Sequence, residues 1–304
     1  MLQYEEFKKE VLEGLMEICG SNARIRIERI LKNNGKSYDG VQIDVDGING
    51  CVCPIVPLEW FYEVYCDGGI NIAGCARTIY KISEAGRERK GVLELIGRVM
   101  NWEQVKRNIY PILLSTEENQ EMLREIVSNS MLDLSVGYIV RAEMDNRCVS
   151  IKINYRMLES YGINVGQLHR QALENLVSDG YRFHDMRSFI VDSGYDVSDE
   201  PELEKIEPPE ELYILTNEVR FYGAAGILDK ELIREFADGR NFYILPSSIH
   251  ETIFVPADDR VDVESYNCIV KIVNERFLDI EERLADHVYF YNAVADEIRV
   301  CLKG

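Results

Sequence analysis

The sequence contains no apolar run that approaches the roughly 20 residues a helix needs to cross a bilayer. Its first ten residues are charged from Glu5 onward and lack the apolar core of a secretory signal. We therefore expect a cytoplasmic protein that makes no use of a membrane.

Closely spaced cysteine pairs are also scarce. Of eight cysteines, only Cys51 and Cys53 lie within three residues of each other, as Cys-x-Cys. A structural zinc site usually draws on two such pairs, and a reducing cytoplasm keeps isolated thiols free. We expect no disulfide framework, no metal and no cofactor.

Basic residues are outnumbered, with 34 against 53 acidic ones and a net charge of −19. The imbalance is concentrated in residues 126–304, which carry 33 acids and 18 bases. Such a surface repels phosphates, which argues against direct binding of DNA or RNA and is compatible with a basic protein partner. The oligomeric state stays open.

What is present is an ordinary globular composition, 46% hydrophobic and 29% charged. Residues 3–19 have helical hydrophobic spacing, and the period then changes to two around Ile25 and Ile27. Asn34-Gly35 favours a tight turn because both residues tolerate positive φ. The class we expect is α+β, with mixed or antiparallel sheets, packed helices, and an N-terminal helix followed by a β-meander.

We place one α+β region at 1–125 and a second at 126–304. In the first, residues 101–109 and 116–125 have the pattern of short helices, with Thr116 as the N-cap of the latter. The second region has alternating helix and strand patterns. Its predicted helices are 155–161, 164–178, 231–238 with Asp229 as the N-cap, and 262–277. Its predicted strands are 131–143, 148–153, 212–215, 242–245, 252–255, 287–291 and 297–302.

The stretch 192–211 stands apart because it holds nine acids against one base, Lys205, together with three prolines. Like charges repel one another and proline interrupts helices, so we expect an exposed loop here.

Several segments resemble one known family. They are Lys32-Asn33-Asn34-Gly35, the run from Leu215 to Leu228, Tyr243-Ile244-Leu245-Pro246-Ser247-Ser248-Ile249-His250-Glu251, and Asp286-His287-Val288-Tyr289-Phe290-Tyr291. Together they are similar to the uncharacterised clostridial family of unknown function DUF5688. The resemblance spans nearly the whole chain and implies an intracellular bacterial protein. It implies no activity and no catalytic residue.

Ser248 and His250 are the weak candidates for catalysis. On an extended strand, side chains two residues apart share a face, so a serine nucleophile could meet a histidine base. The third group that would orient the histidine is not evident, and no Gly-x-Ser-x-Gly motif is present. The alternative is a turn over Pro246–Ser248, with His250 on a solvated strand face.

His287, Tyr289 and Tyr291 alternate along a predicted strand and would therefore share one face. That face is either a ligand-binding surface, with His287 and Tyr289 as candidates, or simply the wetter side of a sheet.

Asn217 and Arg220 are candidates for anion binding, against a turn-stabilising asparagine and an ion-paired arginine. The neighbouring Gly223-Ala224-Ala225-Gly226 lacks the dinucleotide-binding spacing. Its small residues predict close packing of two elements instead.

No complete catalytic set emerges from these patterns. Our leading hypothesis is a non-enzymatic binding or regulatory module that acts by protein–protein contact. The alternative is a hydrolase centred on Ser248 and His250. A further alternative is an acidic mimic of nucleic acid that binds a DNA-handling protein.

Overall fold

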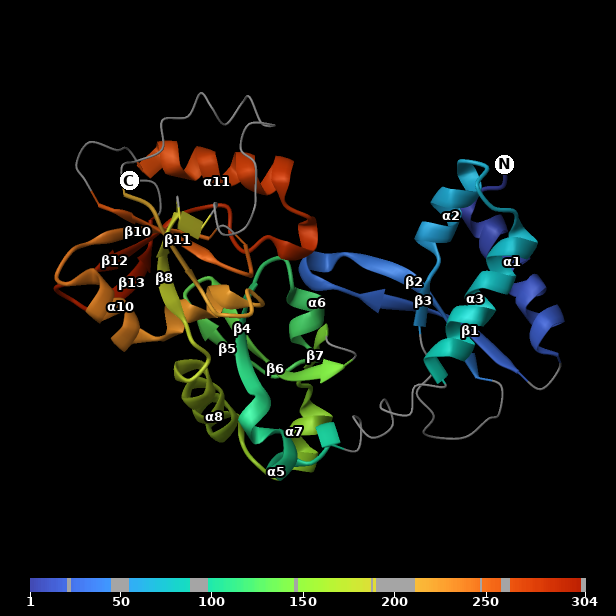
Figure 1. The fold of residues 1–304 in the computed structure, drawn as a ribbon, viewed down its shortest axis with the longest axis horizontal. Coiled ribbons are helices and arrows are strands. Elements are labelled where there is room, and N and C mark those ends of the chain that lie inside the picture. Colours follow the sequence, from blue (N-terminus) through green and yellow to red (C-terminus); the bar gives the residue numbers. More distant parts are fainter. Residues whose placement is uncertain are drawn as a thin grey trace. The chain divides into compact units, whose positions relative to one another are not determined.

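The computed structural model describes residues 1–20, 23–44, 55–87, 98–144, 147–186, 188–189, 211–246, 248–257 and 263–301. The predicted acidic loop 192–211, apart from Glu211, lies outside these residues, as do Cys51 and Cys53. The chain forms two compact units (Figure 1). The first comprises residues 1–32 and 36–100, and the second comprises residues 33–35 and 101–304.

The first unit is a three-stranded antiparallel sheet with three described helices. Helix α1 (Tyr4–Cys19) precedes strands β1 (Arg24–Leu31) and β2 (Ser37–Asp44), which pair along their full length. Strand β3 (Ile55–Pro57) pairs with β2 and is followed by α2 (Glu59–Cys66) and α3 (Ile72–Arg87). The predicted order of helix and β-meander is confirmed.

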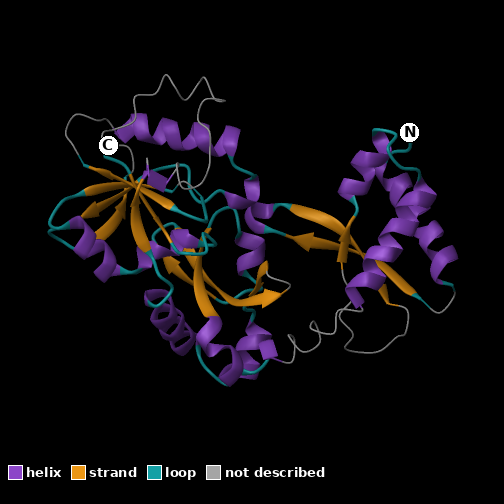
Figure 2. Cartoon of the chain, in the orientation of Figure 1, coloured by secondary structure: helices purple, strands orange, loops and turns teal. Residues whose placement is uncertain are grey.

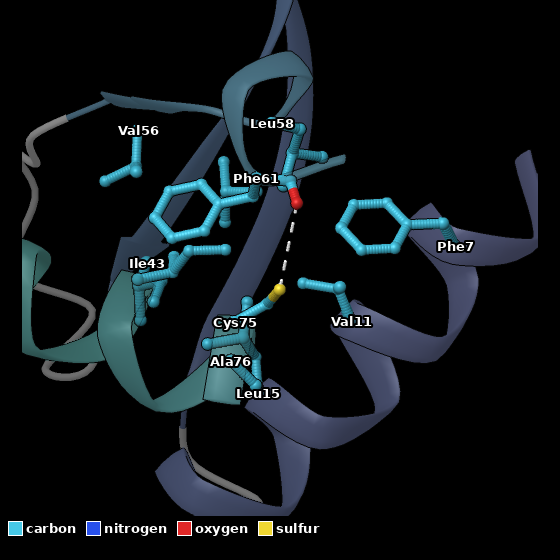
Figure 3. Close-up of a cluster of buried hydrophobic side chains, with 11 residues drawn as sticks. Phe7, Val11, Leu15, Ile43, Val56, Leu58, Phe61, Cys75 and Ala76 are labelled. Atoms are coloured by element: carbon cyan, nitrogen blue, oxygen red, sulfur yellow. Dashed lines mark hydrogen bonds between the residues drawn. The ribbon is translucent and has the colours of Figure 1, made fainter. Parts of the chain in front are cut away.

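The core of the first unit lies between its helices and its sheet (Figure 3). Phe7, Val11 and Leu15 are spaced by four residues, so α1 presents them on one buried face. Cys75 of α3 packs against them and directs its thiol toward the Phe61 carbonyl oxygen, 4.0 Å away. Each large apolar side chain buried here contributes about 1.5–3 kcal/mol relative to exposure.

The second unit holds two further antiparallel sheets. In the smaller one, the long strand β6 (Leu134–Met144) pairs with β4 (Ile109–Ser115), β5 (Ser128–Met131) and β7 (Arg147–Lys152). The helical segments around this sheet are α5 (Trp102–Val105), η2 (Lys106–Asn108), α6 (Gln120–Leu123), α7 (Tyr155–Tyr161) and α8 (Val165–Val177). The short turn η1 (Asn33–Gly35) belongs with this unit.

The larger sheet has six strands in the order β13-β12-β10-β11-β9-β8. These strands are β8 (Arg182–Asp185), β9 (Tyr213–Thr216), β10 (Phe242–Leu245), β11 (Thr252–Pro256), β12 (Tyr289–Asn292) and β13 (Glu297–Val300). The helical segments between them are η5 (Gly223–Leu228), α10 (Lys230–Ala237), α11 (Val263–Phe277) and η6 (Ile280–Glu282).

Helix α11 covers one face of the larger sheet (Figure 2). Its Tyr266 and Val270 are buried against Val255 of β11, Leu245 of β10 and Val288. This packing anchors the segment 280–288, which follows α11 and leads into β12. The candidate site described below is built largely from that segment.

Two features of residues 101–125 differ from the sequence prediction. Residues 109–115 form strand β4, which was not predicted, and its Ile112, Leu113 and Leu114 are all buried. The N-cap residue of α6 is Asn119, not Thr116. Since β4 pairs with β6, this stretch belongs with the second unit, so the unit boundary falls at residues 100 and 101 instead of 125.

Within the described ranges, none of the helices is long and apolar enough to span a bilayer. The free cysteines among these residues are Cys19, Cys66, Cys75, Cys268 and Cys301. The α+β class with antiparallel sheets is confirmed.

Candidate functional site

A cavity of about 240 Å³ lies in the second unit, where four segments far apart in sequence meet. The segments are η1, the connection from β4 to α6, the turn between β5 and β6, and residues 280–287. We call the cavity the carboxylate pocket. Its lining residues are Asn34, Ser115, Glu117, Glu118, Asp133, Ile280, Arg283, Leu284, Ala285, Asp286 and His287.

Asp133 enters the pocket from a tight hairpin turn. Met131 pairs with Leu134, so Leu132 and Asp133 are the only two residues between β5 and β6. Leu132 has φ of 55°, a left-handed conformation that hairpin turns normally assign to glycine or asparagine. Asp133 is therefore held at the tip of a rigid turn rather than on a long loop.

Two residues near the start of β12 lie against the Asp133 carboxylate. The Tyr289 hydroxyl donates a hydrogen bond to Oδ1 at 3.0 Å, and the buried Nε2 of His287 lies 3.0 Å from Oδ2. Burial, reinforced by the Asp133 charge, raises the pKa of Tyr289 well above its ordinary value. The phenol therefore remains a hydrogen-bond donor, and Asp133 remains fixed beside the imidazole.

Few positively charged side chains lie beside the other carboxylates of the pocket. Within the described residues, neither Glu117 nor Glu118 forms an ion pair, and both are exposed. Asp286 accepts a hydrogen bond from Asn274 Nδ2 at 2.7 Å. Arg283 is the permanently charged cation of the lining, and its Nε is buried without a hydrogen-bond partner. The pocket is therefore electronegative.

The wall of the pocket at η1 is a network of buried amides. Asn34 adopts a left-handed conformation with φ of 56°, and its backbone N–H donates to Asn119 Oδ1 at 2.8 Å. Asn119 Nδ2 returns a hydrogen bond to Asn34 Oδ1 at 2.7 Å, and Asn34 Nδ2 reaches the Arg283 carbonyl oxygen at 2.7 Å. The Asn33-Asn34-Gly35 turn predicted from sequence thus fixes the position of residues 280–283.

The carboxylates of the pocket come from three separate segments of the chain. Over the described parts of the chain, no group of three His, Cys, Asp or Glu side chains is placed to hold a metal ion. Glu117 and Glu118 lie between β4 and α6, Asp133 lies in the β5–β6 turn, and Asp286 lies in the segment that leads into β12. A guanidinium or ammonium group on an alkyl chain can hydrogen-bond to carboxylates of this kind.

Ser248 and His250 lie elsewhere, in the loop that joins β10 to β11. The Ser248 hydroxyl donates to Glu251 Oε1 at 2.8 Å and accepts from the His250 backbone N–H at 2.9 Å. The His250 ring instead accepts the Tyr222 N–H at Nδ1, at 3.1 Å. The segment is thus a turn rather than an extended strand, and Ser248 bonds to the backbone of His250 instead of its imidazole.

Asn217 is buried and organises the turn before η5. Its side chain accepts from the Phe221 N–H and donates to the Phe221 carbonyl oxygen, both at 3.1 Å. It also donates to Asp179 Oδ2 at 2.9 Å. Arg220, with φ of 51°, stacks its guanidinium 4.2 Å from the centre of the Phe189 ring. Neither residue lines the carboxylate pocket.

The small residues of η5 allow the close packing that the sequence predicts. A Cβ at Gly223 would collide with the His250 carbonyl oxygen and the Thr216 hydroxyl, and a Cβ at Gly226 would meet the Tyr181 ring at 2.6 Å. Glycine is therefore required where this segment crosses β9 and the β10–β11 loop.

Of the candidates predicted from sequence, the structure brings His287 and Tyr289 together at the carboxylate pocket. The prediction that Tyr289 and Tyr291 face the wetter side of a sheet is wrong, because both are buried and only their hydroxyls reach polar partners. Glu117, Glu118, Asp133 and Arg283 were not predicted. The one available signal was Asp286, adjacent to His287 in sequence.

The model of a family of unknown function, DUF5688, matches residues 4–293. No curated protein and no solved structure gave a significant match. Since the match covers nearly the whole chain, the protein belongs to the DUF5688 family.

Proposed function

We propose that the protein is a non-enzymatic binding module that accepts a lysine or arginine side chain of a protein partner in the carboxylate pocket. The observation that carries this proposal is the charge of the lining, in which four carboxylates face a single permanent cation, Arg283. We further propose that the protein acts in the cytoplasm, which agrees with the free thiols among its described cysteines.

The size of the pocket supports a side chain as the occupant. Pockets for drug-sized ligands measure roughly 300–1,000 Å³, and this one is smaller, at about 240 Å³. A basic side chain places its alkyl stem along a cavity wall and its charged head among acceptors. Ile280 and Leu284 offer apolar surface for the stem, and Asp133 and Asp286 offer oxygen atoms for the head.

Electrostatics favours such a ligand at short and long range. A pair of opposite charges 4 Å apart gains about 1 kcal/mol in bulk water and about 4 kcal/mol near a protein surface. The net charge of −19 also draws a basic partner toward the protein before contact. Binding should therefore weaken as salt screens these interactions.

The test is a binding titration with a fluorescein-labelled oligo-arginine peptide at low ionic strength. The pocket variant carries Glu117→Gln, Glu118→Gln and Asp286→Asn. Its control carries Glu159→Gln, Glu174→Gln and Glu235→Gln, which remove the same charge from exposed positions outside the pocket. We expect the pocket variant to lose about tenfold or more in affinity and the control to stay within about twofold.

Equal losses of peptide affinity in the pocket variant and in its control would contradict the proposal. They would favour the acidic-mimic alternative, in which charges spread over the surface act together. Absence of any measurable binding to the wild-type protein would also contradict it.

A further inference from the structure

A second cavity of about 270 Å³ lies in the same unit and is mainly apolar. Its apolar lining comes from Met131 and Leu132 at the β5–β6 hairpin, from Ile227 and Leu228 of η5, and from Ile233 of α10. We call it the aliphatic cavity. Its composition suits a hydrocarbon side chain.

The two cavities share one hairpin turn. Leu132 lines the aliphatic cavity, and its neighbour Asp133 lines the carboxylate pocket. Consecutive Cα atoms lie about 3.8 Å apart, so a single peptide unit contributes to the walls of both cavities.

Strand β12 contacts one lining residue of each cavity. Tyr289 and Tyr291 lie on the same buried face, two residues apart. The Tyr289 hydroxyl bonds to Asp133 in the carboxylate pocket, and the Tyr291 hydroxyl bonds to Asp296 Oδ1, at 2.9 Å, in the aliphatic cavity. Side chains at positions i and i+2 of an extended chain are roughly 7 Å apart. That is also the spacing of alternate side chains in an extended peptide ligand.

Leu132 itself points to a binding role. It is 48% exposed and sits at positive φ, where glycine would avoid both the strain and the exposed apolar surface. An exposed leucine at this position improves neither the folding of the hairpin nor the solubility of the protein. A partner that covers the Leu132 side chain with apolar surface gives this leucine a role.

Charge also selects the partner. The two cavities together are lined by six carboxylates and by two permanently charged cations, Lys230 and Arg283. Asp296, on the aliphatic cavity, is ion-paired with Arg234 at 2.9 Å. A basic segment complements this rim, and an acidic segment is repelled by it.

From this juxtaposition we infer that the ligand is an extended basic segment of a protein partner, with an arginine or lysine and an aliphatic residue separated by one position. The basic side chain enters the carboxylate pocket and the aliphatic side chain enters the aliphatic cavity, across the Leu132–Asp133 turn. This inference rests on the proposed function and adds the sequence pattern that the site recognises.

The test compares three short labelled peptides by NMR titration. The first contains Arg-Ser-Leu in a Gly/Ser background, the second has serine in place of the leucine, and the third separates arginine and leucine by several residues. Burial of a leucine side chain predicts about tenfold tighter binding of the first peptide than of the other two. Equal binding of all three would overturn the inference and leave the proposed function intact, provided that the binding depends on the pocket carboxylates.

Variants locate the source of the preference. Leu132→Gly and, separately, Met131→Ser should reduce the tenfold preference for the first peptide to about twofold or less. Val177→Ser removes an exposed apolar side chain from the end of α8 and should leave the preference unchanged. A preference that survives both hairpin variants would contradict the aliphatic cavity as its origin.

Discussion

The Tyr289 hydroxyl donates a hydrogen bond to Asp133 Oδ1 across 156 residues of sequence. This bond ties the tip of the β5–β6 hairpin to strand β12 of the larger sheet. Because His287 lies against the other oxygen of the same carboxylate, the geometry of the carboxylate pocket depends on this connection.

The first prediction concerns that bond. Tyr289→Phe keeps the buried ring and removes the donor to a charged acceptor, which should lower the free energy of unfolding by about 1.5–3 kcal/mol. Tyr155→Phe is the matched control, because Tyr155 is 51% exposed, and should change the value little. Urea denaturation measures both, and equal stabilities for the two variants would show that the bond contributes nothing.

A buried ion pair in the second unit supplies the next prediction. Arg141 binds both oxygens of Asp179, at 2.7 and 3.0 Å, and the two side chains are only 13% and 10% exposed. Asp179→Asn leaves the Arg141 charge buried without its counter-ion, which should cost about 3–5 kcal/mol.

The matched control for that pair is Glu218→Gln. Its ion pair with Arg182 is 2.7 Å long but lies on the surface, with side chains 65% and 57% exposed. Surface pairs contribute about 0–1 kcal/mol, so this variant should be nearly neutral in the same denaturation experiment. An unchanged free energy of unfolding for Asp179→Asn would show that burial does not make this ion pair important for stability.

His169 gives a prediction for pH. The Tyr138 hydroxyl accepts a hydrogen bond from Asn129 Nδ2 at 2.7 Å and lies 2.8 Å from Nδ1 of His169. Burial lowers the pKa of the His169 imidazole below the ordinary 6.5. The unfolded chain therefore takes up the proton at a higher pH than the folded chain.

The stability that His169 provides should thus be present above about pH 6.5 and decline as the pH falls below it. We expect the free energy of unfolding of the wild type to fall more steeply between about pH 7 and pH 5 than that of His169→Gln. Parallel pH profiles for the two proteins would contradict this assignment.

Substitution of Ser248 tests whether the β10–β11 loop has a structural or a catalytic role. Its hydroxyl bonds to Glu251 and to the His250 N–H, so Ser248→Ala should lower the free energy of unfolding by about 1–3 kcal/mol. The hydrolase alternative predicts instead that the variant loses a turnover that the wild type shows in an esterase, peptidase or phosphatase screen. A stable, inactive Ser248→Ala protein would favour the hydrolase.

Local patterns predicted much of the fold. The stripe Phe7, Val11 and Leu15 defines α1, and Asp229 caps α10 through the Leu232 N–H as its position indicates. Strand β4 escaped prediction because its buried run has neither a helical nor an alternating period, and only its pairing with β6 identifies it.

The candidate site was less predictable, for a physical reason. His287 was identified from the predicted strand 287–291. Asp133, Glu117 and Arg283 join His287 in the pocket lining only through the tertiary fold, which the local spacing of residues does not predict. In a chain with 53 acids, any single carboxylate also carries little information. Only the fold shows which carboxylates surround a cavity and which ones face open solvent.

The central claim is that the carboxylate pocket receives a basic side chain, and the most direct measurement is an NMR titration of the isotope-labelled protein with the oligo-arginine peptide. The account predicts that the largest shifts occur at the backbone amides of Asp133, Asp286 and His287, and that Glu117→Gln/Glu118→Gln/Asp286→Asn abolishes the shifts at Asp133 and His287. Shifts centred on another surface, or unchanged shifts at Asp133 and His287 in the triple variant, would contradict it.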